Sequence, residues 1–135
     1  MCLALYLFTD NKMEEIVFDK ENPGLFLREI MEREYAVKNW VADKPHIYYV
    51  GSSQGCGCGW EAALESDEEA EIAEKTKDRQ ALHQLLASQN FAGSHLIICW
   101  EGDQGDELER PDKVSLAQIR DVNFEFEECV DYQIE

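Results

Sequence analysis

Residues 46–60, HIYYVGSSQGCGCGW, join a short apolar run to a loop that has four glycines in ten residues. The run at 46–50 is rich in β-branched and aromatic residues and stops at glycine and serine, which predicts a strand. Beyond the loop, residues 61–90 place apolar side chains at helical spacing. Residues 95–100, HLIICW, form a second β-type run, which predicts a strand buried on both faces. The order is therefore strand, glycine-rich loop, helix, strand.

This order predicts a crossover unit whose two strands run parallel in one sheet. The apolar run at residues 2–8 adds another strand, and residues 123–134 alternate enough to predict a terminal strand. Residues 24–31 fit a helix and a strand equally well. With 135 residues, the chain is long enough to bury about two-thirds of its surface on folding. We therefore expect a single two-layer domain over residues 1–135, of the α/β or α+β class, with a mixed sheet.

The chain is strongly acidic, with 29 acidic and 12 basic residues and a net charge of −17. Residues 1–60 contain 9 acidic and 6 basic side chains, whereas residues 61–135 contain 20 and 6 and include a predicted acidic loop at 101–112. Nucleic acids and anionic membranes bind proteins largely through lysine and arginine, so neither is an expected partner. The charge favours a metal cation or a basic protein surface instead. One hypothesis is therefore a non-catalytic interaction module whose acidic second half binds a basic partner.

The cysteine content favours reduced thiols. An odd number of cysteines does not suit a closed disulfide framework. The apolar run at residues 2–8 lacks the basic region and the cleavage site of a signal peptide, and it is too short to span a bilayer. We therefore expect a cytoplasmic protein with free thiols. The five cysteines are Cys2, Cys56, Cys58, Cys99 and Cys129.

The spacing of Cys56 and Cys58 is the sharpest chemical signal in the sequence. In extended backbone, residues two apart point to the same side, and two thiolates form half of a tetrahedral site for a soft metal ion. The candidates for the remaining ligands are His46, His95, Cys99 and Cys2. A reactive thiol and simple packing of small cysteines between glycines are the other interpretations. Packing, our leading interpretation, predicts that both thiols are buried and that neither pKa is lowered.

The direction of the two central strands determines which residues lie near this loop. If the two central strands are parallel, their carboxyl ends meet at the loop and bring Glu101 and Asp103 beside it. His46 and His95 then begin at the opposite end of the sheet. The second hypothesis is a domain that binds a small ligand or a metal ion here. Its candidate binding residues are Cys56, Cys58, Cys99, Glu101 and Asp103, with Cys56 and Cys58 as the candidate metal ligands. No cofactor and no catalytic residue can be assigned from the sequence.

Three segments together resemble a known family. They are MCLALYL at the start of the chain, PHIYYVGS at residues 45–52 and GCGCGW at residues 55–60. In these segments the chain is similar to a family of small uncharacterised bacterial proteins. The resemblance covers the first sixty residues, and the GCGCG loop is its most specific part. Because that family has no assigned activity, the resemblance implies no ligand, cofactor or catalytic role.

Overall fold

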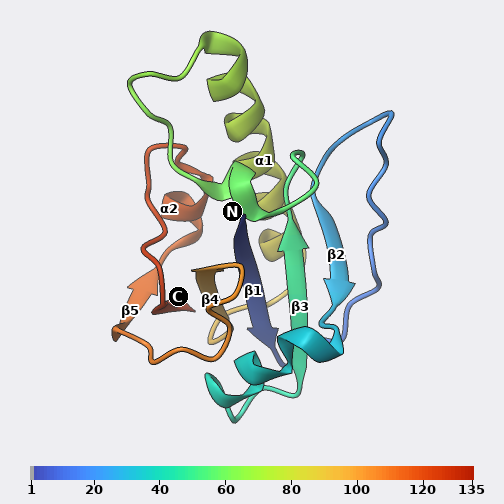
Figure 1. Cartoon of the computed structure of the whole chain (residues 1–135), viewed down its shortest axis with the longest axis vertical. Helices are drawn as coiled ribbons and strands as arrows, with labels where there is room; N and C mark the ends of the chain where they lie inside the picture. The colour runs from blue at the N-terminus through green and yellow to red at the C-terminus, as the bar shows by residue number, and fades with distance from the viewer. Residues whose placement is uncertain (1) are drawn as a thin grey trace.

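The computed structural model describes residues 2–135 and has an α+β fold built on one mixed six-stranded sheet, as predicted (Figure 1). The order of the strands is β2-β3-β1-β4-β6-β5. In chain order, the strands are β1 (Leu3–Thr9), β2 (Phe26–Glu29), β3 (His46–Gly51), β4 (His95–Trp100), β5 (Arg110–Val114) and β6 (Val130–Ile134). The helices are the 3₁₀ helices η1 (Glu32–Asn39) and η2 (Gly57–Trp60) and the α-helices α1 (Glu69–Ala87) and α2 (Leu116–Arg120).

Strand β1 lies at the centre of the sheet. It pairs antiparallel with β3 on one side, where Leu5 faces Val50, and antiparallel with β4 on the other, where Leu5 faces Ile98. Strands β3 and β4 therefore run in the same direction, as predicted, but β1 separates them. Because β1 runs antiparallel to both neighbours, its first residues lie at the end of the sheet where β3 and β4 terminate.

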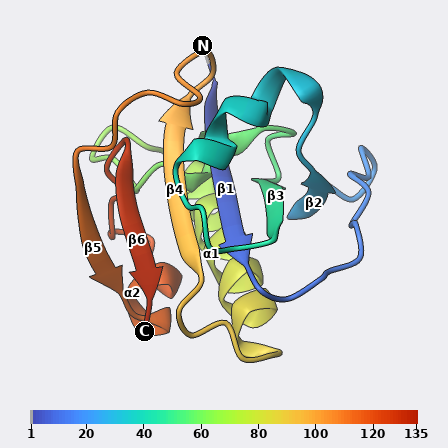
Figure 2. The same cartoon turned by 90° about the horizontal axis from the view of Figure 1, so that it is seen from below.

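Helices cover both faces of the sheet, which adds a layer to the two that the sequence predicts. Helices α1 and α2 lie on one face, and η1 lies on the other (Figure 2). Alternate side chains of β1 point to opposite faces of the sheet. On one face, Leu3, Leu5 and Leu7 pack with Leu82 of α1. Ala4, Tyr6 and Phe8 pack on the opposite face with Val37 of η1. Within residues 2–135, no helix is both long enough and apolar enough to cross a membrane.

Some element boundaries differ from the sequence predictions. Residues 26–29 are a strand, which settles the ambiguous segment, and the long helix begins at Glu69 rather than at residue 61. The predicted acidic loop ends in a strand, β5, which pairs parallel with β6. Most side chains of β5 are exposed and Pro111 lies within it, so this edge strand has no apolar alternation to detect.

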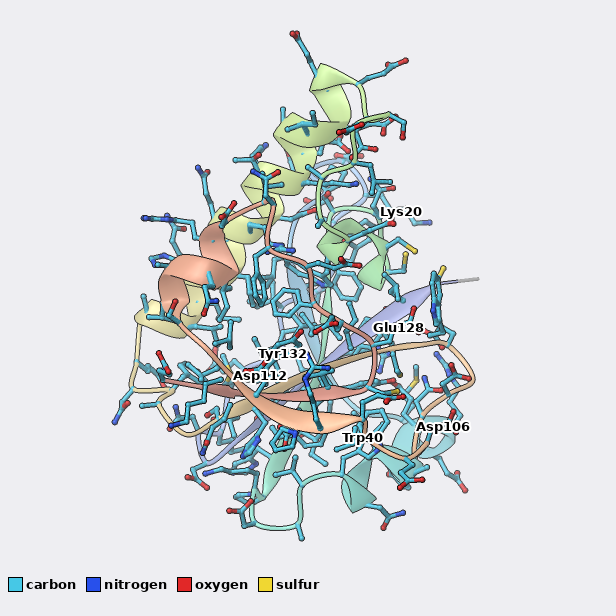
Figure 3. The ribbon with its side chains drawn as sticks, turned by 90° about the vertical axis from the view of Figure 1, so that its left-hand side faces the viewer. Lys20, Trp40, Asp106, Asp112, Glu128 and Tyr132 are labelled. Carbon is cyan, nitrogen blue, oxygen red and sulfur yellow. The ribbon has the colours of Figure 1, made fainter. Side chains whose placement is uncertain are left out.

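The acidic segment that follows β4 packs onto η1. The indole Nε1 of Trp40 donates a hydrogen bond to the carbonyl of Asp106 at 2.7 Å (Figure 3). The side chain of Gln104 donates to the hydroxyl of the buried Tyr6 at 3.1 Å. These contacts hold the segment that begins at Glu101 close to the end of the sheet where β1 starts.

The buried carboxylate of Glu34 connects η1 to strands β1 and β2. Glu34 is 1% exposed, accepts hydrogen bonds from Tyr6 and from the Met31 amide, and forms an ion pair with Arg28 at 2.6 Å. Burial alone would raise the pKa of Glu34. The hydrogen bonds from Arg28, Tyr6 and Met31 outweigh burial, and the pKa of Glu34 is lowered.

The Glu34→Gln variant should lose about 2 kcal/mol of unfolding free energy at pH 7, because the charge-assisted bonds are lost. A carboxylate whose pKa is lowered on folding stabilises the protein above its unfolded pKa of about 4.3, and this stabilisation disappears as the pH falls. The difference between wild type and Glu34→Gln should therefore shrink from pH 6 to pH 3. Urea unfolding at each pH measures it, with Glu32→Gln on the exposed face of η1 as the control. A difference independent of pH would contradict the assignment.

Candidate functional site

The glycine-rich loop after β3 is anchored by two serines. The hydroxyl of Ser52 donates to the carbonyl of Cys56 at 2.7 Å and accepts from the amide of Gly59 at 3.0 Å. The amide and hydroxyl of Ser53 both donate to the carboxylate of Asp78 in α1, at 3.0 and 2.8 Å. Burial raises the pKa of Asp78, and the two bonds from Ser53 offset only part of that effect. The loop is therefore fixed to both its own strand and the long helix.

Glycine allows this loop to lie directly against β1. A Cβ atom at Gly57 would stand 2.2 Å from the carbonyl oxygen of Leu3 and 2.6 Å from its carbonyl carbon. The indole of Trp60 is fully buried and donates to the carbonyl of Val50 at 2.9 Å, which closes the loop. Figure 1 shows the start of β1 beside η2. This close approach places Cys56 and Cys58 next to the first residues of β1.

Three cysteines form one cluster as a result. Cys2 precedes β1, and its sulfur joins those of Cys56 and Cys58 so that all three Sγ atoms lie within 4.8 Å of one another. In a tetrahedral zinc site with bonds of about 2.3 Å, thiolate sulfurs are about 3.8 Å apart. Each of the three side chains is half-buried, so the cluster is accessible from solvent. The three sulfurs are therefore close to the separation that a shared metal ion would require.

Hydrogen bonds within the cluster distinguish the thiols. Burial raises the pKa of Cys56 to about 12, although the amide of Cys58 donates to its sulfur at 3.4 Å. Burial acts in the same direction on Cys58, but a hydrogen bond with the backbone of Leu3 opposes it. Bonds from the thiols of Cys56 and Cys2 add to that effect, so the pKa of Cys58 is lowered. The packing interpretation predicts two buried thiols and no lowered pKa, whereas both thiols are half-buried and the pKa of Cys58 is lowered, so these observations do not favour it.

Two cavities adjoin the cluster. Cys2 and Cys56 line an open cavity of about 610 Å³, together with Arg28, Tyr49 and Glu101. Cys58 lines a second cavity, of about 330 Å³, whose other walls include side chains of α1. A ligand can therefore reach the sulfurs without any rearrangement of the core.

Of the other predicted site residues, one lies beside the thiol cluster and two lie elsewhere. Glu101 lies beside the cluster, and its amide donates to the carbonyl of Cys2 at 2.8 Å. Cys99 is fully buried on the η1 face and pairs with Ala4 across the sheet. Burial raises the pKa of Cys99 to about 12, and the charges of Cys129 and Asp103 raise it further. Cys99 and Asp103 lie outside the cluster formed by the three thiols.

The histidines lie at the far end of the sheet, as the parallel strands predict. His46 pairs with Thr9, the last residue of β1, and His95 pairs with Phe8. His95 also bonds to the carboxylate of Asp131 at 2.6 Å. Neither imidazole can join the thiols, so the cluster among the described residues consists of cysteine alone.

Sequence reasoning did not single out the basic residues of this site. Arg28 and Arg33 line the larger cavity, but they come from β2 and η1, which are far from the loop in sequence. An isolated arginine in an ambiguous segment gives no signal by itself. The position of Cys2 could have been inferred by placing the first strand between the two central strands.

Comparison of the chain with protein-family models, with curated proteins and with solved structures finds no match. Function must therefore be inferred from the geometry of the site itself.

Proposed function

We propose that this protein binds one thiophilic metal ion, with Zn²⁺ as the best fit, through the sulfurs of Cys2, Cys56 and Cys58. The observation that supports this function is the convergence of three thiols from two distant segments within 4.8 Å. Thiolates favour Zn²⁺, Cu⁺ and iron–sulfur clusters over Mg²⁺ and Ca²⁺. Among these, Zn²⁺ binds readily to three protein ligands and one further donor.

The rigidity of the loop supports the same function. Ser52, Asp78 and Trp60 hold the backbone on both sides of the Cys-x-Cys pair, so little order has to be gained when the metal binds. The third ligand, Cys2, directly precedes the central strand β1. A bound metal would therefore cross-link β1 to the loop after β3 and stabilise the fold.

Removing one ligand tests the proposal. Wild-type protein, reduced and free of metal, should bind one Co²⁺ and show the intense thiolate-to-cobalt charge-transfer absorption of a sulfur-rich site. Cys58→Ser should weaken Co²⁺ binding by at least about 100-fold, since even residues outside the ligand set can alter metal affinity by 10-fold to 100-fold. Competition with a chelator, followed by absorption, measures the affinity.

The matched control is Cys129→Ser, because Cys129 is also half-buried but lies outside the cluster. It should leave the stoichiometry and the affinity for Co²⁺ unchanged. Equal losses in both variants, or a wild-type protein that takes up no Co²⁺, would contradict the proposed function. Circular dichroism of each variant verifies that the fold is retained.

A further inference from the structure

The larger cavity beside the thiols has a local charge unlike that of the whole chain. In a protein with a net charge of −17, two arginines, Arg28 and Arg33, line the cavity into which Cys2 and Cys56 open. One carboxylate, Glu101, lines the same cavity. The remaining walls are largely apolar or aromatic and are formed by Phe26, Met31, Tyr49 and Gly55. A cavity of this kind suits a small organic anion better than a cation.

Arg28 is held in place. Its guanidinium lies over the ring of Tyr49, 4.1 Å from the ring centroid. One of its terminal nitrogens bonds to Glu34 at 2.6 Å and to the carbonyl of Glu29 at 3.2 Å. A guanidinium has five N–H donors, so the other donors remain for a ligand. Arg28 therefore offers a preorganised site for a carboxylate.

Arg33 is the second cation and is more accessible. Its side chain is exposed, and it forms no ion pair with any residue of the described range 2–135. Among the described residues, its one hydrogen bond to a side chain is a weak one of 4.0 Å to the sulfur of Met31. A charge without a partner at the mouth of a cavity can bind an anion at little cost in existing contacts.

The coordination of the metal leaves one position to fill. Three thiolates and a divalent ion together carry one negative charge, and a tetrahedral site needs a fourth donor. The described residues supply three sulfurs to the cluster and no fourth ligand within the same distance. A fourth donor that is itself an anion requires compensating positive charge nearby, which Arg33 provides; the charge of Arg28 is balanced by Glu34, and Arg28 contributes its remaining N–H donors.

We propose that this cavity binds a small thiol that carries carboxylate groups, with its sulfur on the metal and its carboxylates on Arg28 and Arg33. The inference rests on the proposed metal site. On binding, the thiol loses its proton to solvent, its sulfur forms a bond to the metal, and no oxidation or reduction takes place. Phe26 and Tyr49 contact the carbon chain of the ligand.

Mercaptosuccinate, which has one thiol and two carboxylates, is the probe. It is titrated into the Co²⁺-loaded protein, and the d–d absorption reports the change in coordination. Ultrafiltration then measures whether cobalt and thiol stay with the protein in equal amounts. The comparison ligands are thioglycerol, which lacks carboxylates, and succinate, which lacks the thiol. Mercaptosuccinate should bind about 10-fold more tightly than thioglycerol, and succinate should leave the absorption unchanged.

Arg33→Gln should weaken mercaptosuccinate binding by roughly fivefold while leaving the affinities for thioglycerol and for Co²⁺ as in wild type. Arg120→Gln, an exposed arginine in α2, is the matched control and should change none of them. Equal binding of the two thiols, no effect of Arg33→Gln, or removal of cobalt from the protein by mercaptosuccinate would overturn this inference but not the proposal that the three cysteines bind a metal ion. A wild-type protein that takes up no Co²⁺ overturns both proposals.

Discussion

Replacing Arg79 by methionine is expected to lower the free energy of unfolding by about 4 kcal/mol. Arg79 lies in α1 with no exposed surface and forms no ion pair within residues 2–135. Its guanidinium instead donates to four backbone carbonyls. They belong to Ile119 at 3.1 Å, Asp121 at 2.8 Å, Trp60 at 3.0 Å and Phe124 at 2.6 Å.

The size of this effect follows from the carbonyls that would be left without a donor. Each buried polar group that loses its partner costs about 1–3 kcal/mol, and water can reach some of the four. Burial lowers the pKa of Arg79 to about 10, because the charged guanidinium is poorly solvated in the folded protein. The four bonds and the ring of Phe126, 4.8 Å away, offset that cost. Methionine fills much of the volume but supplies no donor.

Urea unfolding of the two proteins at pH 7 measures the difference. Lys77→Met is the matched control, because Lys77 is an exposed cation on the same helix. It should change the unfolding free energy by less than about 0.5 kcal/mol. A loss below about 1 kcal/mol for Arg79→Met would mean that the four carbonyls find other donors.

Gly57→Ala is expected to cost about 3 kcal/mol of stability and to weaken Co²⁺ binding by at least about 10-fold. The added Cβ would stand 2.2 Å from the carbonyl oxygen of Leu3 and 3.0 Å from the Cα of Ala4. Both are backbone atoms of the central strand, which is paired on both sides and cannot move aside. The loop must retreat instead, which separates Cys56 and Cys58 from Cys2.

The control for this variant is Gly24→Ala, because a Cβ at Gly24 meets no atom within 4 Å. It should leave both the unfolding free energy and the affinity for Co²⁺ close to wild type. If Gly57→Ala loses stability but binds Co²⁺ as well as wild type does, Cys2 does not contribute to the metal site. Cobalt titration of the folded fraction separates the two effects.

Much of the architecture could be predicted because it depends on local patterns. The two central β-type runs are strands β3 and β4, and they run in the same direction as their order requires. That direction also placed Glu101 beside the loop and His46 and His95 at the opposite end. A short exposed edge strand such as β5 has no apolar periodicity, and so it could not be recognised.

The candidate site was harder to predict, because its parts meet only through long-range pairing. The Cys-x-Cys spacing identified two members of the thiol cluster, whereas the third depended on the position of β1. The family resemblance and the basic partner stay predictions. The acidic second half does supply most of a cavity of about 410 Å³ walled by Trp100 and Phe126. Its glutamates are Glu61, Glu109, Glu125, Glu127 and Glu128.

The central position of β1 has a consequence for the order of events during synthesis. The chain is made from its amino end, so β1 leaves the ribosome before either strand that pairs with it. Its neighbour β3 ends at Gly51 and its neighbour β4 ends at Trp100, so β1 has to wait for about a hundred residues before both of its edges are paired. Until then, an apolar strand with two open edges is exposed to other chains. The three thiols meet where β1 contacts the loop after β3, so a metal bound at the cluster would hold β1 beside β3 while its other edge is still unpaired.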